Sequence, residues 1–522
     1  MAGRSFATAI VLTVVTALTA VATPVAAGAA GGSITYALEA ETPGGYCSGA
    51  DQLAISGIMV ENAVYDTLTE INSQGKYVPY LAKSITPNAT YDRWTIELRP
   101  GIRFQNGEAL DANAVKLNLD KLRHGLLTSF TFTPVTDVQV TGPLTVVVTT
   151  KAPWLALPGA LWGGGRFGIA APEQLNSPDC ATKLIGTGPF RLVSWRPQEE
   201  LVVERNPDYW RPGLPRIDRI TFKPVGAAET MVNGLISGQF DVIQTSNARA
   251  IEHMRKLAAQ KKIRLDASDK NAEVGYLLLN VSKPPFNDPV ARRAVAYAGD
   301  REEINAIIND GTLRLADGPF PPGSPAYLPK SGYPPHNLKR ARALVRRYER
   351  THNEKLAFEY ETGTSPDLIQ LAQLVQKQLQ AAGITTKLKT VDEASQINDA
   401  LAGSFQAQAF RNHPGGDPDL QYPWWHSGSP INFGRIKDPE IDRLLDAGRV
   451  ETDPAKRARL YQELNRRFAH ELYDLWTWYT LWGIGTARDV RGALGPPLPD
   501  NGGKPFPIFG GYVPVLGLSK TR

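Results

Sequence analysis

The chain has 522 residues and a mass of 56.9 kDa, which exceeds what one hydrophobic core usually serves, so we expect about three domains. Apolar residues make up 42% and charged residues 21%, a composition that excludes a largely disordered chain and is typical of a globular protein. The net charge of +5 is small for this length and does not indicate a nucleic-acid-binding protein.

Residues 1–30 have the pattern of an export signal. The cation Arg4 precedes an apolar run of roughly fifteen residues, and small residues follow Pro24. We expect cleavage near residue 28 or 31, which would place the mature chain in the periplasm or outside the cell. No cysteine lies near the cleavage zone to carry a lipid, so we expect a chain without a lipid anchor.

The first half of the mature chain predicts short strands and turns around a few helices. Residues 33–38 read as a first strand, and residues 60–71 as a helix that leads into an extended segment. Residues 94–122 predict two short strands with tight Pro-Gly and Asn-Gly turns, followed by a helix that starts near Asp111. Residues 136–150 predict a hairpin of Val and Thr strands. We therefore expect a compact mixed unit here.

The second half alternates strands and helices. Residues 272–281 read as a strand and 288–304 as a helix, and residues 368–390 predict a helix that stops at Gly383 and is followed by a strand. This alternation predicts α/β layers with covered sheets. The densest basic stretch, 337–350, has apolar residues on one helical face and arginines on the other, so we interpret it as a solvated amphipathic helix.

The G-T-G in residues 185–195 (IGTGPFRLVSW) does not predict a phosphate-binding loop. No Lys-Ser/Thr follows it, Arg191 stands where a dinucleotide fingerprint has its third glycine, and Pro189 lacks an N–H donor. A strand follows instead of a helix, so no helix N-terminus is present to hold a phosphate. A G-x-G-x-x-G at 163–168 follows a proline-broken loop and no clear strand, so we do not interpret it as a nucleotide site.

Cys47 and Cys180 are the only cysteines in the sequence. In an exported protein an even number favours pairing, so we expect a disulfide between them. Two buried, unreactive thiols are the alternative. A count of free thiols in the denatured, unreduced chain distinguishes the two.

Common catalytic motifs are absent from the sequence, which contains no H-E-x-x-H, C-x-x-C or G-x-S-x-G. We therefore expect no enzyme, no cofactor and no resident metal, with a secreted hydrolase as a remote alternative. His413 and His426 flank one loop, which leaves a metal site there as an alternative to ordinary polar loop residues.

A series of segments shares one pattern along nearly the whole mature chain. They read VYDTLTEINSQGKYVPYLAKSI, WTIELRPGIRFQNGEALDANAV, GTGPFRLVSW, ERNPDYW, PRIDRITFKPV, GLISGQFDVI, LLLNVSKPPFNDPVARRAVAYAGDREEI, LVQKQLQAAGITTKL and DPEIDRLL. In this order they resemble the extracellular solute-binding proteins of ATP-binding-cassette importers, in the peptide, nickel and opine class called family 5.

The resemblance implies a type II periplasmic binding protein fold of the α/β class, with two lobes joined by a hinge, a ligand cleft between them and a small inserted α/β domain. Residues 185–195 would be the re-entry of the chain into the first lobe, where the glycines serve a tight backbone path. The implied boundaries are 1–30 for the signal peptide, 31–68, 184–282 and 482–522 for lobe I, 69–183 for the inserted domain and 283–481 for lobe II.

The resemblance also implies a function without catalysis. We expect a monomer that captures a short peptide or a related amphoteric solute by lobe closure and delivers it to the membrane permease of the importer, with no nucleic-acid partner. Oligosaccharide or metal-chelate binding on the same fold are the alternatives. A sugar-binding relative would use stacked aromatics, for which Trp154, Trp162, Trp424 and Trp425 are available, although core or rim packing explains each of them as well.

The loop at residues 410–433 contains the predicted ligand contacts. Peptide-binding relatives use an aspartate in the corresponding loop to hold the ligand's α-ammonium, which implies Asp417 or Asp419 here, with Trp424 and Trp425 beside them. A buried ammonium needs a fixed anion to offset its desolvation. The alternative is that this Gly-rich segment forms a turn with Asx-type hydrogen bonds. The loop lacks the tryptophan that often precedes the aspartate in that family.

Overall fold

The computed structural model describes residues 1, 31–42, 44–50, 55–125, 128–413 and 415–521. Residues 2–30, which carry the predicted export signal, lie outside them. Within the described part of the chain, no helix combines the length and the apolar character needed to cross a membrane.

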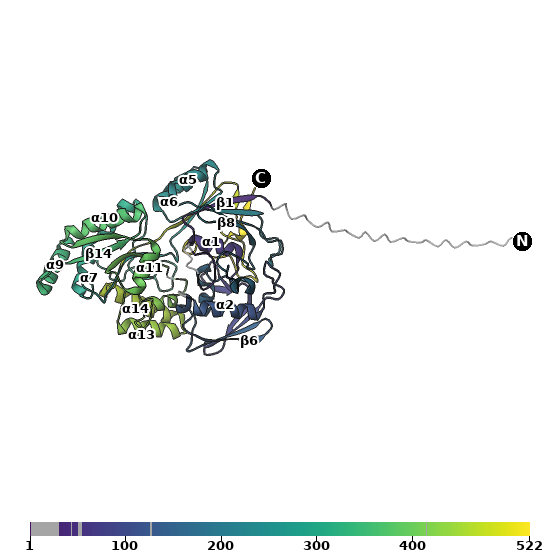
Figure 1. The fold of residues 1–522 in the computed structure, drawn as a ribbon, viewed down its shortest axis with the longest axis horizontal. Helices are drawn as coiled ribbons and strands as arrows, with labels where there is room; N and C mark the ends of the chain where they lie inside the picture. The colour runs from purple at the N-terminus through teal and green to yellow at the C-terminus, as the bar shows by residue number, and fades with distance from the viewer. Residues whose placement is uncertain (2–30, 43, 51–54, 126–127, 414, 522) are drawn as a thin grey trace.

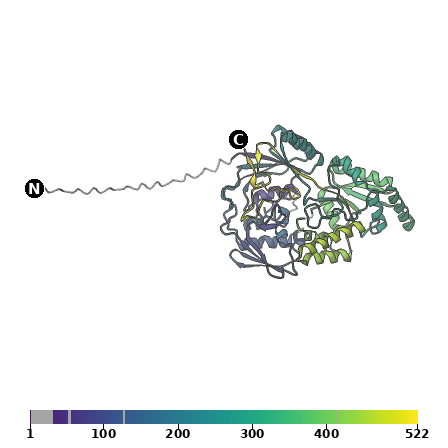
Figure 2. The same cartoon turned by 180° about the vertical axis from the view of Figure 1, so that it is seen from behind.

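A seven-stranded sheet forms the centre of one of the two bodies seen in Figures 1 and 2. Its strand β1 runs parallel to both of its neighbours, β10 and β11, whereas the outer pairs are antiparallel. In spatial order the strands are β12 (Arg264–Ser268), β18 (Trp482–Thr486), β11 (Val242–Thr245), β1 (Ser33–Leu38), β10 (Arg219–Pro224), β9 (Glu200–Arg205) and β8 (Phe190–Arg196). We call this sheet and the elements around it the first lobe. These elements are α1 (Ile55–Val64), α5 (Ala228–Ser237), α6 (Ala248–Ala259), β19 (Val490–Arg491), η4 (Val515–Gly517) and β20 (Ser519–Lys520).

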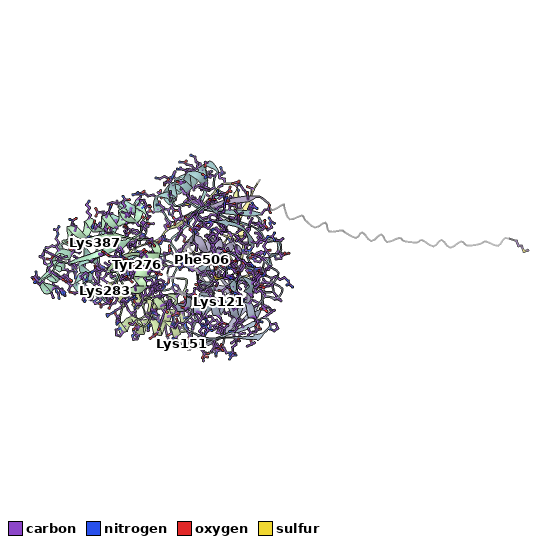
Figure 3. The ribbon with its side chains drawn as sticks, viewed as in Figure 1. Lys121, Lys151, Tyr276, Lys283, Lys387 and Phe506 are labelled. Atoms are coloured by element: carbon purple, nitrogen blue, oxygen red, sulfur yellow. A yellow bond between two sulfur atoms is a disulfide. The ribbon has the colours of Figure 1, made fainter. Side chains whose placement is uncertain are left out.

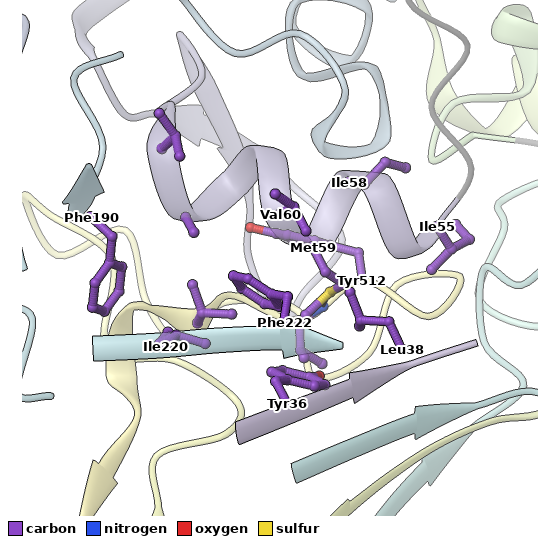
Figure 4. Close-up of a cluster of buried hydrophobic side chains, with 14 of the residues drawn as sticks. Tyr36, Leu38, Ile55, Ile58, Met59, Val60, Phe190, Ile220, Phe222 and Tyr512 are labelled. Atoms are coloured by element: carbon purple, nitrogen blue, oxygen red, sulfur yellow. Dashed lines mark hydrogen bonds between the residues drawn. The ribbon is translucent and has the colours of Figure 1, made fainter. Parts of the chain in front are cut away.

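Helix α1 packs in one hydrophobic core with the N-terminal strand and the C-terminal segment of the first lobe. Ile58 and Met59 are fully buried and lie in one cluster with Tyr36 of β1 and Phe222 of β10, whose rings stack 5.7 Å apart (Figure 4). Tyr512, from the C-terminal segment, belongs to the same cluster. Burial of each such side chain contributes about 1.5–3 kcal/mol. The cluster therefore joins the N-terminal strand and the C-terminal segment.

A four-stranded antiparallel sheet lies between α1 and β8 in the chain, in the region of the predicted inserted domain. Its spatial order is β4 (Ala82–Pro87), β5 (Arg93–Leu98), β7 (Thr145–Thr150) and β6 (Val135–Gly142). Helix α2 (Ala112–His124) packs on β6 and β7 and begins at the predicted position, because Asp111 accepts a hydrogen bond of 2.8 Å from the N–H of Ala114. The shorter elements are β2 (Thr69–Ile71), β3 (Tyr77–Pro79), η1 (Thr128–Phe130), α3 (Leu157–Trp162), η2 (Gly163–Gly165) and α4 (Pro172–Leu175).

A five-stranded sheet forms the second body, called the second lobe below. Its spatial order is β15 (Thr385–Thr390), β14 (Ala357–Thr362), β16 (Ala407–Asn412), β13 (Val274–Leu279) and β17 (Asp474–Tyr479). Its helices are α7 (Pro289–Ala298), α8 (Arg301–Asn309), α9 (Leu338–His352), α10 (Pro366–Ala381), α11 (Glu393–Ala402), η3 (Pro418–Gln421), α12 (Tyr422–Trp425), α13 (Pro439–Val450) and α14 (Pro454–Glu471). Figure 3 labels Tyr276 in this lobe and Phe506 in the first lobe, on the two sides of the boundary.

The chain crosses between the two large sheets twice, from β12 to β13 through residues 269–273 and from β17 to β18 through residues 480–481. The two crossover segments are hydrogen-bonded to each other, since the N–H of Thr480 donates to the carbonyl oxygen of Glu273 at 2.8 Å. Strand β13 already pairs with β16 and β17, so the first crossing comes before the predicted boundary at residue 282. The apolar run of β13 predicted a strand but carried no information on which sheet it joins.

The predicted disulfide is present between Cys47 and Cys180. It joins the segment between β1 and α1 to the segment between α4 and β8, at a sequence separation of 133 residues. No free cysteine is found among the described residues. The bridge therefore fastens the end of the predicted inserted region to the first lobe.

The glycines of the 185–195 segment lie against the backbone at the end of α1. A Cβ on Gly186 would lie 2.1 Å from the carbonyl oxygen of Val64, and a Cβ on Gly188 would lie 2.4 Å from the carbonyl carbon of the same residue. No residue with a side chain fits at either position. The glycines thus serve a close backbone approach next to β8, as predicted, and hold no phosphate loop.

A buried carboxyl in the second lobe makes stability depend on pH. Asp474 of β17 is 1% exposed, its Oδ1 has no partner among the described residues, and burial raises its pKa to about 8. In the unfolded chain an aspartate loses its proton near pH 4. Between about pH 4 and pH 8 the folded state therefore binds more protons than the unfolded state, and this group lowers the free energy of unfolding as pH rises.

We expect Asp474→Asn to raise the free energy of unfolding by on the order of 1–3 kcal/mol more at pH 8 than at pH 5. Urea unfolding of the parent and the variant at the two pH values measures this difference. Asp489→Asn, at a side chain that is 42% exposed, is the matched control and should show no such difference. Equal effects of the two substitutions would contradict the prediction.

Candidate functional site

The candidate site lies where the two lobes meet, beside the crossover segments. Strands β1 and β11 of the first lobe are parallel, and their carboxyl ends are at Leu38 and Thr245. In open α/β sheets, ligands bind outside the carboxyl ends of such strands. The C-terminal turn at Gly510 and Gly511 comes to this edge, because the side-chain amide of Gln244 in β11 donates to the carbonyl oxygen of Gly511 at 2.6 Å. We call this region the interlobe site.

The turn at Gly510 and Gly511 brings the lobes into close contact. A Cβ on Gly510 would lie 2.1 Å from Nε2 of His413 and 3.1 Å from the carbonyl oxygen of Asn271. A Cβ on Gly511 would lie 2.6 Å from the Trp482 ring. Both glycines have positive φ, 52° and 87°. The contact between the lobes therefore requires glycine at position 510, and the packing of the turn on Trp482 of the first lobe requires glycine at position 511.

Aromatic rings form one wall of the interlobe site. Phe509 lies with its ring centroid 4.6 Å from that of Trp162 and 5.4 Å from that of His413. Trp162 also contacts Tyr77 and Tyr512, each at 5.9 Å. Trp162 is fully buried in these contacts, and its Nε1 has no hydrogen-bond partner among the described residues.

Besides Nε1 of Trp162, four buried polar atoms near the turn and the crossover segments have no hydrogen-bond partner among the described residues. They are Nε1 of Trp482, Oε1 of Gln244, Oδ1 of Asn271 and Oε2 of Glu273. Native proteins satisfy the great majority of their buried polar groups. Two of these atoms come from strands of the first lobe and two from the crossover segment 269–273, and we interpret them as donors and acceptors for a polar ligand.

Charges of both signs face each other at this point. Arg411 is the penultimate residue of strand β16, its guanidinium lies 6.0 Å from the centre of the Trp482 ring, and its Nε is 3.5 Å from Oε2 of Glu273. Its side chain is 47% exposed. Arg166, which follows η2, lies near His413, since a Cβ on Gly164 would be 2.9 Å from Nη1 of Arg166 and 3.9 Å from Cε1 of His413. The site can therefore contact both an anionic and a cationic group.

His413 is held as a neutral hydrogen-bond donor. The backbone N–H of Gly415 donates to its Nδ1 at 3.0 Å, which assigns the ring proton to Nε2. Burial, together with the positive charges of Arg166 and Arg411, lowers the pKa of His413 to about 3. At neutral pH the ring therefore presents an uncharged Nε2–H toward the first lobe.

The two aspartates predicted to contact a ligand have other partners in the structure. Asp417 accepts two hydrogen bonds from Arg457, at 2.8 and 2.6 Å, and its Oδ1 also accepts from the N–H of Asp419 at 2.9 Å. Asp419 is 1% exposed and accepts from Arg449 at 2.9 Å and from Trp154 at 2.7 Å. An ammonium would have to compete with these guanidinium groups. The ligand role of both aspartates stays a prediction.

The tryptophans of the same loop pack inside the second lobe. Trp425 is 3% exposed and lies between the rings of Phe320 and Phe468, at 5.8 and 4.9 Å. Trp424 is partly buried against Phe433, at 5.3 Å. These contacts are those of core and rim residues. A contact of either tryptophan with a solute stays a prediction.

The two histidines of the loop have different neighbours. His426 stacks on Tyr422 at 4.5 Å, and its Nε2 is 3.6 Å from Asp446, whereas His413 lies at the interlobe site. Within the described ranges, no group of three or more His, Cys, Asp or Glu side chains is arranged to hold a metal ion. This geometry does not support a metal site at this loop, which the sequence had left as an alternative.

A small cavity on the first-lobe side does not provide an alternative solute site. Its volume is about 20 Å³, with Asp66, Glu70, Tyr80 and Arg211 in its lining. Burial raises the pKa of Asp66 to about 6 and that of Glu70 to about 8. A space of this size holds about one water molecule, so it stabilises polar groups and is too small for a peptide or a sugar.

Several residues of the interlobe site were not found from the sequence, namely Gln244, Asn271, Glu273, Arg411, Trp482 and Gly510. Their segments are far apart in the chain and none carries a recognisable motif. The consecutive glycines at 510–511 were the one local signal, because a Gly-Gly pair outside a regular element indicates a close backbone approach.

Comparison with known proteins adds a family match. The model of the bacterial extracellular solute-binding proteins, family 5 Middle, matches residues 76–433. Among curated proteins, the glutathione-binding protein GsiB of Salmonella typhi is 27% identical over 435 residues, which cover 77% of this chain and 81% of the relative.

Solved structures share the fold. The binding protein AgaA from A.tumefacien R10, in complex with agropinic acid, superposes with a TM-score of 0.82 at 23% identity and covers 94% of this chain and 99% of its own. The oligopeptide-binding protein AppA from Bacillus subtilis, in complex with a nonapeptide, gives a TM-score of 0.78 at 22% identity and covers 88% and 95%. At these identities the similarity establishes the fold alone.

Proposed function

The chain belongs to the bacterial extracellular solute-binding proteins of family 5, and from this membership we propose that it captures short peptides or related amphoteric solutes between its lobes. It is a substrate-binding protein of an ATP-binding-cassette importer, and members of the family are binding proteins and not enzymes. The partner that we propose for delivery is the membrane permease of that importer. Its glutathione-binding relatives support a peptide-like solute.

The observation that supports an amphoteric solute is the composition of the interlobe site. Arg411 and Glu273 bring opposite charges to one place, and buried polar atoms without partners surround them. A solute with a carboxylate and an amine offers matching groups for both charges. A purely apolar solute would leave the same atoms unsatisfied, at a cost of about 1–3 kcal/mol for each group.

Capture would proceed by closure about the two crossover segments. Residues 269–273 and 480–481 are the two covalent links between the sheets, so a rotation there separates the lobes without disturbing either core. A ligand shifts this equilibrium only by its preference for the closed form. A change from mostly open to mostly closed needs about 5.5 kcal/mol of preference, which a charged contact and several hydrogen bonds supply.

Native mass spectrometry of freshly purified protein, followed by small-angle scattering with and without a peptide pool, tests the proposal. We expect retained or added peptide-like species and a smaller radius of gyration in their presence. A retained sugar or metal complex would instead favour the oligosaccharide or metal-chelate alternative. The absence of both binding and compaction with every solute would contradict the proposed function.

The predicted ammonium contact of Asp417 and Asp419 is tested with a bound peptide and its N-acetylated form. Calorimetry on the parent, Asp417→Asn and Asp419→Asn compares the affinities. Losses of more than threefold, about 0.7 kcal/mol, on both acetylation and substitution would support the contact. Affinities within threefold throughout would leave Arg457 and Arg449 as the partners of these carboxylates.

A further inference from the structure

We propose that the hydrogen bond between Trp154 and Asp419 is a closure contact, which holds the second lobe against the predicted inserted region and adds equally to the affinity for every solute. The indole Nε1–H of Trp154 donates to Oδ2 of Asp419 at 2.7 Å, and both residues are 1% exposed. The inference rests on the proposed capture by closure and names a contact that stabilises the closed form independently of the chemistry of the solute.

The two ends of this contact belong to parts of the chain that closure brings together. Trp154 follows β7 in the predicted inserted region, which is joined to the first lobe by the disulfide and by Gln105, whose side-chain amide donates to the carbonyl oxygen of Phe190 at 2.7 Å. Asp419 lies in η3 of the second lobe. In Figures 1 and 2, helices α13 and α14 of the second lobe lie next to the part of the inserted region that contains α2. Opening about the crossover segments therefore separates Trp154 from Asp419.

The second lobe by itself fixes the position of Asp419. Its Oδ1 accepts a hydrogen bond of 2.9 Å from Arg449 of α13, and its backbone N–H donates to Asp417 at 2.9 Å. The carboxylate of Asp417 is in turn paired with Arg457 of α14. One carboxylate oxygen of Asp419 is therefore bonded inside the second lobe, and the other accepts from the opposite side of the boundary.

Apolar contacts accompany this hydrogen bond on both sides of the boundary. Leu420 of the second lobe packs against the hydrophobic cluster of the predicted inserted region, to which Trp154 belongs. Phe130 of η1 packs in return against a cluster of the second lobe that includes Trp425 and Phe468. Opening would expose these apolar surfaces to water. A hydrogen bond to a carboxylate is stronger in such a shielded boundary than in water, so the contact favours the closed form.

Such a contact acts on affinity through the population of the closed form. Only the closed form makes all the contacts to a solute, so the apparent dissociation constant rises when the closed fraction falls. Because the hydrogen bond does not include the solute, its loss should weaken the binding of chemically different solutes by one common factor. A side chain that contacts the solute would instead change these affinities unequally.

Trp154→Phe tests the contact, because it removes the Nε1–H and keeps an aromatic ring in the core. We expect an affinity loss of about three- to tenfold by calorimetry, equal within about twofold for glutathione and for two peptides of different charge from a pool of di- to tetrapeptides. We also expect a larger radius of gyration of the ligand-free protein by small-angle scattering. Trp94→Phe is the matched control and should change neither quantity, since Trp94 is 4% exposed in the same cluster and its Nε1 donates to Tyr91 within the region.

Either effect of Trp154→Phe beyond the control supports the closure contact. A loss that differs more than about twofold among the solutes would overturn the proposal, as would the absence of both effects. A loss confined to solutes with a free α-ammonium would also overturn it, and would assign the Asp419 carboxylate to the ligand.

A second variant perturbs the same boundary from the other lobe and decides the question if Trp154→Phe does not fold. A Cβ on Gly416 would overlap with the hydroxyl of Tyr77 and lie 3.2 Å from the Phe509 ring. Gly416→Ala should therefore separate the closed lobes and weaken binding of all solutes alike. Gly428→Ala, in the same segment, is its control and should bind like the parent, because a Cβ there would lie 3.5 Å from its nearest neighbour, His426.

Failure of the closure contact and failure of the proposed function are distinguishable. If no solute binds to the parent, the proposed function is wrong, and scattering of the ligand-free parent and variants still tests the contact. If solutes bind and compact the parent, but the variants neither bind more weakly nor open, only the closure contact is wrong.

Discussion

Asp419→Asn should lower the free energy of unfolding by about 3–5 kcal/mol, because the substitution leaves the buried guanidinium of Arg449 without its anion. Asp419 and Arg449 are 1% and 8% exposed, and their N–O distance is 2.9 Å. The second oxygen of Asp419 accepts from Trp154 at 2.7 Å, so the same residue also joins the second lobe to the predicted inserted region. Urea unfolding monitored by tryptophan fluorescence measures the loss.

Glu440→Gln is the matched control for this prediction. It removes one partner of the Glu440–Arg443 pair, which lies on the same helix as Arg449 but is about half exposed, so we expect a loss below about 1 kcal/mol. Adding Arg449→Met to Asp419→Asn should recover part of the stability, since the unpaired buried charge is then removed. A loss for Asp419→Asn no larger than that of the control would contradict the prediction.

Replacing Cys47 and Cys180 together by serine should lower the free energy of unfolding by about 2–5 kcal/mol. The bridge spans 133 residues, and closing a loop of this length removes about 5 kcal/mol of chain entropy from the unfolded state in the simple model. Because the disulfide acts by lowering the entropy of the unfolded chain, its removal should leave the folded structure and solute binding nearly unchanged.

Equilibrium unfolding of the double variant measures the contribution of the disulfide, and the parent unfolded under reducing conditions is the independent control. Both should lose the same stability, because both lack the same cross-link. If the double variant retains stability within about 1 kcal/mol of the oxidised parent, the bridge contributes less than the loop model predicts.

The sequence by itself determined features that depend on neighbouring residues. Asp288, Asp438 and Asp453 cap helices that begin with proline, and an Asp-Pro pair in the sequence is enough to indicate such a start, because an N-cap needs only a side-chain oxygen two or three residues before a free N–H. The single pair of cysteines left one possible disulfide. The glycines at 186 and 188 predicted a tight path because no other residue tolerates such an approach.

Only the tertiary structure decided which groups meet at the interlobe site. Asp417 and Asp419 are as suitable for a ligand ammonium as for an arginine, and their partners come from helices α13 and α14, up to 40 residues away. Strand β13 has the same sequence pattern in either sheet, and its pairing with β16 and β17 assigned it to the second lobe. The free energy of a charged group depends on the charges and burial that the fold places around it, and no local pattern contains that arrangement.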